Sequence, residues 1–83
     1  MSIAPAAHEI SEWLASYVGE LVARPASEID HDATFESFGI DSANMIGITG
    51  ELQAWLGNSI DPDAAYEYPT IRSLAGYLAG QGG

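Results

Sequence analysis

Apolar side chains recur at steps of three and four residues along most of this chain, which restricts the fold to packed helices. The first such stripe lies between residues 5 and 22, with the acidic residues off it. Its members are Ile10, Trp13, Leu14, Tyr17, Val18 and Leu21. Pro25 disfavours helical backbone at the residue before it, so we expect a first helix over residues 6–22.

The next segment, residues 23–41, sustains no period and is predicted to be a long loop. Three apolar side chains in it, Ile29, Phe35 and Phe38, are too hydrophobic to leave in water, so we expect them to fix the loop to the helices.

Three further helices are predicted from capping residues and breakers, over residues 42–57, 61–67 and 70–80. Asp41 or Ser42 supplies the N-cap of the first, Asp-Pro-Asp at 61–63 forms the cap and first turn of the second, and Thr70 caps the last. Residues 81–83 form a linker-like tail. The prediction is therefore an all-α protein, a small four-helix bundle of three main helices and one short helix, in a single domain over residues 1–83.

Charge and composition exclude several functions. With 2 basic and 12 acidic residues the net charge is −10, which repels nucleic acid and anionic membrane surfaces. The absence of cysteine excludes disulfides, thiolate metal sites and cysteine nucleophiles. Residues 1–10 lack the basic and apolar regions of a signal peptide, and no apolar run reaches membrane-spanning length. We expect a cytoplasmic monomer.

The predicted helix over 42–57 has two unlike faces. At 100° per residue, one sector carries a set predicted to face the core: Met45, Ile48, Thr49, Leu52, Trp55 and Leu56. The opposite sector is uncharged and consists of Ala43, Ile46, Gly47, Gly50, Gln53 and Ala54. Two glycines inside a helix each cost about 1 kcal/mol relative to alanine. This sector is either a second buried contact or a strip that lets another protein approach the backbone closely.

Residues 38–42, Phe-Gly-Ile-Asp-Ser, followed by Met45, Ile46, Ile48 and Leu52, resemble the attachment motif of acyl carrier proteins. The acidic first helix, the long loop with Phe35 and the segment Tyr-Glu-Tyr-Pro-Thr-Ile at 66–71 extend the resemblance to carriers of polyketide and fatty acid synthesis, over nearly the whole chain.

The resemblance implies that Ser42, preceded by the motif residue Asp41, receives 4′-phosphopantetheine from coenzyme A. The thiol of this arm then holds an acyl group as a thioester. Ser42 lacks an activating base, and neither His8 nor His31 has a nucleophile at motif spacing, so we expect a non-catalytic carrier.

The implied partners are a phosphopantetheinyl transferase, an acyl-loading enzyme and a ketosynthase or other synthase domain. The expected partner-binding residues are Ala43, Ile46, Gly47, Gly50 and Glu51. Carriers of this kind place a leucine and an acid where this chain has Ala43 and Gly47. Asp41 and Glu51 remain as acids of this helix, and electrostatic steering is expected together with its flanks, from Glu36, Asp61, Asp63 and Glu67.

Two alternatives stay open. Peptidyl carriers of nonribosomal peptide synthesis resemble Gly-Gly-His-Ser or Gly-Gly-Asp-Ser, and here Ile40 replaces the second glycine, which favours acyl cargo. An unmodified helical docking or adaptor domain is the second alternative. The run 47–57 together with 66–71 is most similar to carriers loaded by fatty acyl-AMP ligases.

Asp30, Asp32 and Thr34 imitate a calcium-binding loop, but Phe35 and Asp41 occupy the positions of its glycine and glutamate, which favours a solvated loop.

Overall fold

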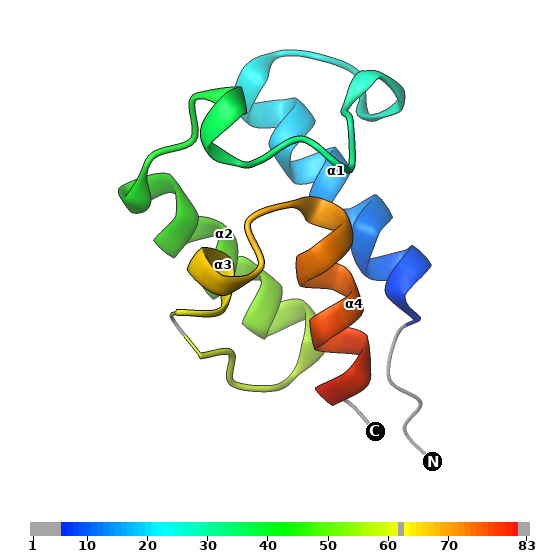
Figure 1. Cartoon of the computed structure of the whole chain (residues 1–83), viewed down its shortest axis with the longest axis vertical. Helices are drawn as coiled ribbons and strands as arrows, with labels where there is room; N and C mark the ends of the chain where they lie inside the picture. Colours follow the sequence, from blue (N-terminus) through cyan, green and yellow to red (C-terminus); the bar gives the residue numbers. More distant parts are fainter. Residues whose placement is uncertain (1–5, 62, 82–83) are drawn as a thin grey trace.

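The structure is a computed structural model that describes residues 6–61 and 63–81, and in these residues it is all-helical (Figure 1). The four α-helices predicted from the sequence are present, and the long loop also contains two short 3-10 turns. In chain order the elements are α1 (Ala7–Val22), η1 (Ala26–Glu28), η2 (Glu36–Phe38), α2 (Ser42–Leu56), α3 (Ala64–Glu67) and α4 (Ile71–Gln81).

The two longest helices end on residues in the left-handed conformation. Ala23, at φ 58°, follows α1, and Arg24 donates its N–H to the carbonyl oxygen of Gly19 at 2.9 Å. A Cβ atom on Gly19 would lie 2.6 Å from the Arg24 carbonyl oxygen, so this tight return of the chain requires glycine. Gly57, at φ 76°, follows α2, which therefore ends at Leu56 and not at the predicted residue 57.

The short helix α3 begins later than predicted, because the start of the expected 61–67 helix is a turn. Asp61 accepts the N–H of Asp63 on its side chain and the N–H of Ala64 on its carbonyl oxygen, both at 2.9 Å. Residue 62 of the predicted cap lies outside the described residues. The last helix begins at Ile71 and includes residue 81, one residue later at each end than expected, and residues 82–83 of the predicted tail are not described.

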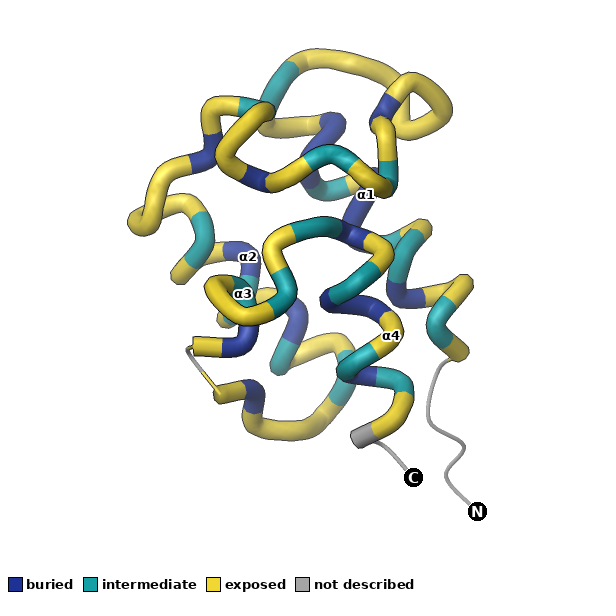
Figure 2. The backbone as a smooth tube through the Cα atoms, in the orientation of Figure 1, coloured by how far each residue is buried: buried dark blue, intermediate teal, exposed yellow. Residues whose placement is uncertain are grey.

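The core runs between the helices and continues under the loop (Figure 2). Its members are apolar residues from the four α-helices, the long loop and the segment between α2 and α3: Ile10, Leu14, Ala15, Val18, Ile29, Phe35, Ile40, Ile48, Leu52, Ile60, Ala64, Ile71, Leu74, Ala75 and Leu78. As expected, Ile29 and Phe35 are buried and Phe38 is half-buried. Burial of these side chains holds the loop against the helices.

Two residues expected in the core stripes are exposed. Leu21 is 45% exposed, because the chain returns over Gly19, about 160° around α1 from Leu21. Trp55 is 41% exposed, because it stacks on Trp13 through one face of its ring, at a centroid distance of 5.6 Å. Helical spacing predicts the direction of a side chain and not how deeply its neighbours cover it.

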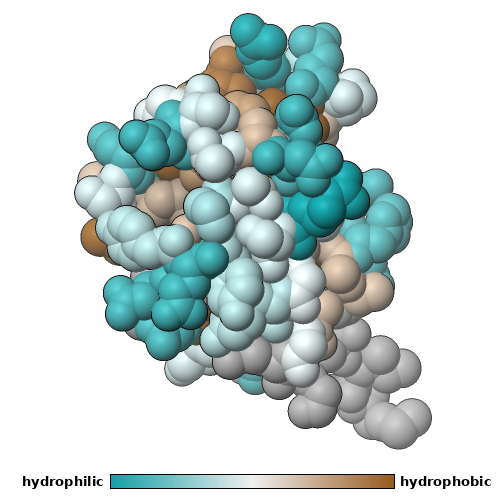
Figure 3. Space-filling view, viewed as in Figure 1, coloured by the Kyte–Doolittle hydropathy of each residue, from teal (hydrophilic) through white to brown (hydrophobic). Residues whose placement is uncertain are grey.

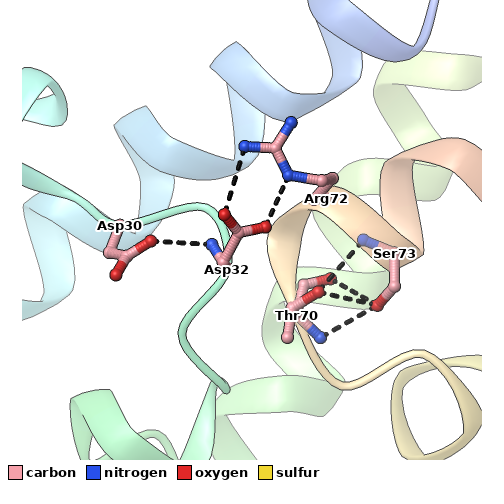
Figure 4. A network of polar contacts seen from close by, with 5 residues as sticks. All are labelled: Asp30, Asp32, Thr70, Arg72 and Ser73. Carbon is pink, nitrogen blue, oxygen red and sulfur yellow. Dashed lines mark hydrogen bonds and ion pairs between the residues drawn. The ribbon is translucent and has the colours of Figure 1, made fainter.

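The loop is joined to the start of α4 by backbone hydrogen bonds. Phe35 donates its N–H to the carbonyl oxygen of Pro69 at 2.9 Å, and Arg72 donates its N–H to that of His31 at 3.0 Å. Figure 4 shows the adjoining ion pair, in which Arg72 Nε lies 2.5 Å from Asp32 Oδ1. The segment before α2 is thus fixed to a part of the chain more than thirty residues later.

Candidate functional site

Ser42 is the first residue of α2, and its side chain is exposed. The preceding residue supplies the N-cap: Asp41 has extended backbone, and its Oδ1 accepts the N–H of Asn44 at 2.8 Å. Within the described chain the Ser42 hydroxyl makes no hydrogen bond. Of the two cap residues left open by the sequence, Asp41 is therefore the one used, and the hydroxyl of Ser42 is available for modification.

The start of α2 is electrostatically suited to a phosphate group. The first N–H groups of a helix have no partner inside the helix, and its dipole is positive at this end. A phosphodiester on Ser42 would lie beside these donors.

The segment that leads to Ser42 is held in place from both sides. Gly39, at φ 80°, ends η2 and turns the chain toward α2. Phe35 and Ile40 on either side of this turn are buried, and Ile40 donates its N–H to the carbonyl oxygen of Phe35 at 3.3 Å. The turn before Ser42 is therefore fixed by two buried side chains and by the backbone hydrogen bond between them.

Two shallow hollows meet at Ser42, between the start of α2 and α3. The larger, of about 510 Å³, extends toward Phe35, Ile40 and Pro69, and the smaller, of about 250 Å³, runs along α2 past Ile46 and Thr49. Both are lined by Ser42, Met45, Ala65 and Tyr66. Hydrophobic atoms are visible in a hollow on the left of Figure 3, where Figure 1 places the start of α2. Ser42 thus stands at the rim of mostly apolar surface.

The expected partner-binding residues of α2 are all exposed. Their spacing of three and four residues places them along one side of the helix, and two of them, Ile46, which is 74% exposed, and Gly50, also line the smaller hollow. An ideal Cβ on Gly47 or Gly50 would meet no heavy atom within 4 Å. The alternative of a second buried contact on this face is therefore wrong.

Gln53 is an exception in the sector predicted to face outward. It is half-buried, and its Oε1 accepts the N–H of Ile60 at 2.8 Å. This bond joins α2 to the segment before α3, so Gln53 has a structural role that helical spacing alone did not reveal.

The acidic residues expected to steer partners are exposed, namely Glu36, Asp61, Asp63 and Glu67. Asp30 and Asp32 form a turn, in which Asp30 Oδ1 accepts the N–H of Asp32 at 2.9 Å. The hydrogen bond from Arg72 lowers the pKa of the Asp32 carboxyl below its ordinary value. In the ranges 6–61 and 63–81 no group of three or more histidine or acidic side chains is placed to hold a metal ion.

Sequence reasoning used the segment 66–71 for the resemblance but missed its part in the site. Tyr66 is 70% exposed and lines both hollows beside Ala65. The signal available in the sequence was a large aromatic residue on a short predicted helix, but nothing in the sequence indicated that this helix lies beside Ser42.

Comparison with known proteins agrees with this geometry. Residues 12–78 match the family model described as "Phosphopantetheine attachment site". The acyl carrier protein TtuC of Teredinibacter turnerae is 30% identical over 73 residues, covering 88% of this chain and 84% of that protein. The chain belongs to the phosphopantetheine-binding carrier proteins, and it is a non-catalytic carrier with acyl and polyketide carriers among its homologues.

Much larger proteins also match over the same region. The polyketide synthase PksL of Bacillus subtilis is 31% identical over 70 residues, which is 84% of this chain but 2% of the synthase. The chain thus corresponds to most of a small carrier protein in one relative and to a small part of a synthase in another.

Solved structures show the same fold. An acyl carrier protein from Anabaena sp. PCC 7120 with a variant phosphopantetheinylation-site sequence has a TM-score of 0.89 at 26% identity, covering 99% of this chain and 94% of that one. A free-standing peptidyl carrier protein from Acinetobacter baumannii has a TM-score of 0.83 at 28% identity, covering 92% and 95%. The acyl-carrier-like four-helix fold expected from the sequence is confirmed. In the described ranges no helix is both long and apolar enough to cross a membrane.

Proposed function

We propose that Ser42 is the attachment residue for 4′-phosphopantetheine, and that Asp41 positions it. The observation that carries this proposal is the exposed hydroxyl at the first position of α2, beside a cap that the preceding residue supplies. In the modification, Ser42 Oγ forms a bond to the phosphorus that bears the pantetheine of coenzyme A. The bond to the nucleotide breaks, 3′,5′-ADP leaves, and a base of the transferase accepts the serine proton.

The arm then carries acyl or polyketide intermediates as thioesters on its terminal thiol. The chain contains no cysteine, so the arm supplies the one thiol of the modified protein. The two hollows that begin at Ser42 offer the arm and its cargo a mostly apolar surface, because burial of apolar groups there is favourable.

We propose that partner enzymes dock on the exposed side of α2 near Ser42. Ile46 is the apolar anchor, and the missing side chains of Gly47 and Gly50 let the partner approach the helix backbone closely. The partners are a phosphopantetheinyl transferase, an acyl-loading enzyme such as a fatty acyl-AMP ligase, and a ketosynthase or another synthase domain. The protein's charge of −10 favours basic docking sites on these enzymes.

The attachment is tested by intact-mass measurement after incubation with coenzyme A and a phosphopantetheinyl transferase of broad specificity. The expected result is the addition of one phosphopantetheine, mapped to the peptide that contains Ser42. Failure of the folded protein to accept the arm would favour the alternative of an unmodified docking or adaptor domain.

Since coenzyme A is the donor, we propose that the protein acts in the cytoplasm. We also propose that it acts as a monomer.

The class of cargo is proposed to be acyl rather than aminoacyl. Ile40, which replaces a glycine of the peptidyl carrier motif, is buried and lines the larger hollow. The modified protein is to be incubated with ATP and either a fatty acyl-AMP ligase plus fatty acid or an amino-acid adenylation domain plus its amino acid. We expect a thioester with the fatty acid; equal loading by the adenylation domain would move the protein to the peptidyl class.

A further inference from the structure

A stack of three aromatic rings connects α1 to α2. Trp13 lies between the other two, with its ring centroid 5.3 Å from Tyr17 and 5.6 Å from Trp55, at interplanar angles of 24° and 17°. The rings are not enclosed by the core: Trp13 and Tyr17 are half-buried and Trp55 is exposed. We call these three residues the aromatic stack.

The aromatic stack is separate from the attachment site. Trp55 follows Ser42 by thirteen residues on α2, a distance of about 20 Å along the helix. Its members do not line either hollow beside Ser42, whereas the exposed apolar residues Ile46 and Tyr66 line the smaller one. Attachment of the arm therefore does not account for this exposed aromatic surface.

Acidic side chains border the aromatic stack. Glu9 and Glu20 precede and follow Trp13 by four and seven residues on α1, and Glu51 precedes Trp55 by four on α2, spacings that place each acid on the same side of its helix. All three acids are exposed. Of the chain's two cations, Arg72 is paired with Asp32. The surface is thus aromatic in the middle and negative at its edge.

The negative charge of the protein determines which kind of partner can bind the aromatic stack. A second copy of this chain, an anionic membrane or a nucleic acid would bring negative charge against negative charge. A cationic side chain is attracted both by the carboxylates and by the exposed ring of Trp55. We propose that the aromatic stack is a second docking surface, which binds a segment of a partner protein that presents arginine or lysine beside apolar side chains.

Intrinsic fluorescence reports directly on this surface, because the chain has two tryptophans and both belong to the aromatic stack. The probe is an amphipathic helical peptide of leucine and arginine, titrated into the full chain. We expect a saturable change in tryptophan emission, with amide chemical-shift changes centred on Trp13, Tyr17 and Trp55.

Two control peptides separate the contributions of charge and apolar surface. In one, glutamate replaces every arginine, and in the other, serine replaces every leucine. Both should bind at least about tenfold more weakly, because the proposed surface requires a cation and an apolar face together. Equal binding of the serine and arginine peptide would reduce the interaction to general charge attraction and overturn the proposal.

Matched variants locate the contact. Trp55→Leu keeps an apolar side chain but removes the ring face, and Glu51→Gln removes one charge; each should weaken binding of the leucine and arginine peptide by about threefold or more. Tyr66→Leu and Glu67→Gln make the same changes on α3 and should leave its affinity unchanged. Chemical shifts centred on α3, or concentration-dependent shifts without peptide, would instead place the docking surface elsewhere or indicate self-association, and either result contradicts the proposal.

Discussion

Asp41 caps α2 with its side chain and leaves the neighbouring Ser42 hydroxyl without a structural task. The carboxylate accepts the N–H of Asn44 at 2.8 Å, while Ser42 lies exposed at the first helical position. Support of the helix end and presentation of the hydroxyl are thus divided between two adjacent residues.

This division predicts different effects of two substitutions. Ser42→Ala should change the free energy of unfolding by no more than about 0.5 kcal/mol, because an exposed side chain without a partner is removed. It should accept no phosphopantetheine. Asp41→Ala should destabilise the protein by about 1 kcal/mol through loss of the cap. Thermal melts and intact mass measure both effects, and a mass increase in the Ser42→Ala protein would exclude Ser42 as the attachment residue.

The two glycines of the proposed docking side give a second prediction. Gly47→Ala and Gly50→Ala should each stabilise the protein by up to about 1 kcal/mol, since alanine favours the helix and the added methyl group meets no atom within 4 Å. Both should slow transfer of the arm or of the acyl group. Gly76→Ala in α4 is the matched control, with equally open space, and should stabilise without slowing transfer. Transfer that is unaffected in all three variants would leave Gly47 and Gly50 without a role in docking.

Ile46→Glu tests the apolar anchor. Because Ile46 is 74% exposed, the melting temperature should change little, with a free-energy change near 0.5 kcal/mol. The rate of phosphopantetheinylation should fall sharply, since a charge replaces the apolar contact. A normal rate would mean that partners approach Ser42 from another side.

The ion pair between Arg72 and Asp32 predicts a pH dependence. The pKa of Asp32 is lowered in the folded protein from 3.8, mainly by the hydrogen bond from Arg72. The pair therefore contributes its full stability above about pH 4, and this contribution is lost as the pH falls through the lowered folded pKa. The difference in melting temperature between the natural protein and Asp32→Asn should shrink in this acidic range. The effect is small, because both side chains are exposed to solvent.

Salt should stabilise the free protein. With a net charge of −10, carboxylates repel one another, and ions screen this repulsion over a Debye length of about 10 Å at 0.1 M salt. The melting temperature should rise from low to moderate sodium chloride while partner binding weakens. A constant melting temperature would show that the carboxylates are already too far apart to interact strongly.

Local patterns in the sequence were sufficient to predict the helices, and they also indicated where a modification site would lie. Helical spacing predicted Ile10, Leu14 and Ile48 as core residues, and the serine beside an acid at a helix start directed attention to Ser42. The helix and core predictions are confirmed, because each depends on residues within one or two turns of one another, whereas the attachment at Ser42 stays a prediction.

The remaining features depend on contacts between distant segments. The exposure of Trp55 depends on its stacking against Trp13, 42 residues earlier, and the role of Tyr66 depends on where α3 lies relative to α2. The turn at Asp61 that delays α3 was missed for another reason, because an aspartate before a short helix is compatible with both a cap and a turn.

The backbone hydrogen bond from Phe35 to Pro69 has a consequence for protein engineering. Since the segment that leads to Ser42 pairs with the residues just before α4, the motif and the 69–72 region form one unit, although α2 and α3 lie between them in the sequence. A graft that transfers residues 35–56 into another carrier should also transfer 69–72, or the new host must offer a matching backbone at that point. In chimeric carriers the fusion points should therefore lie outside the paired segments, before residue 31 and after residue 72.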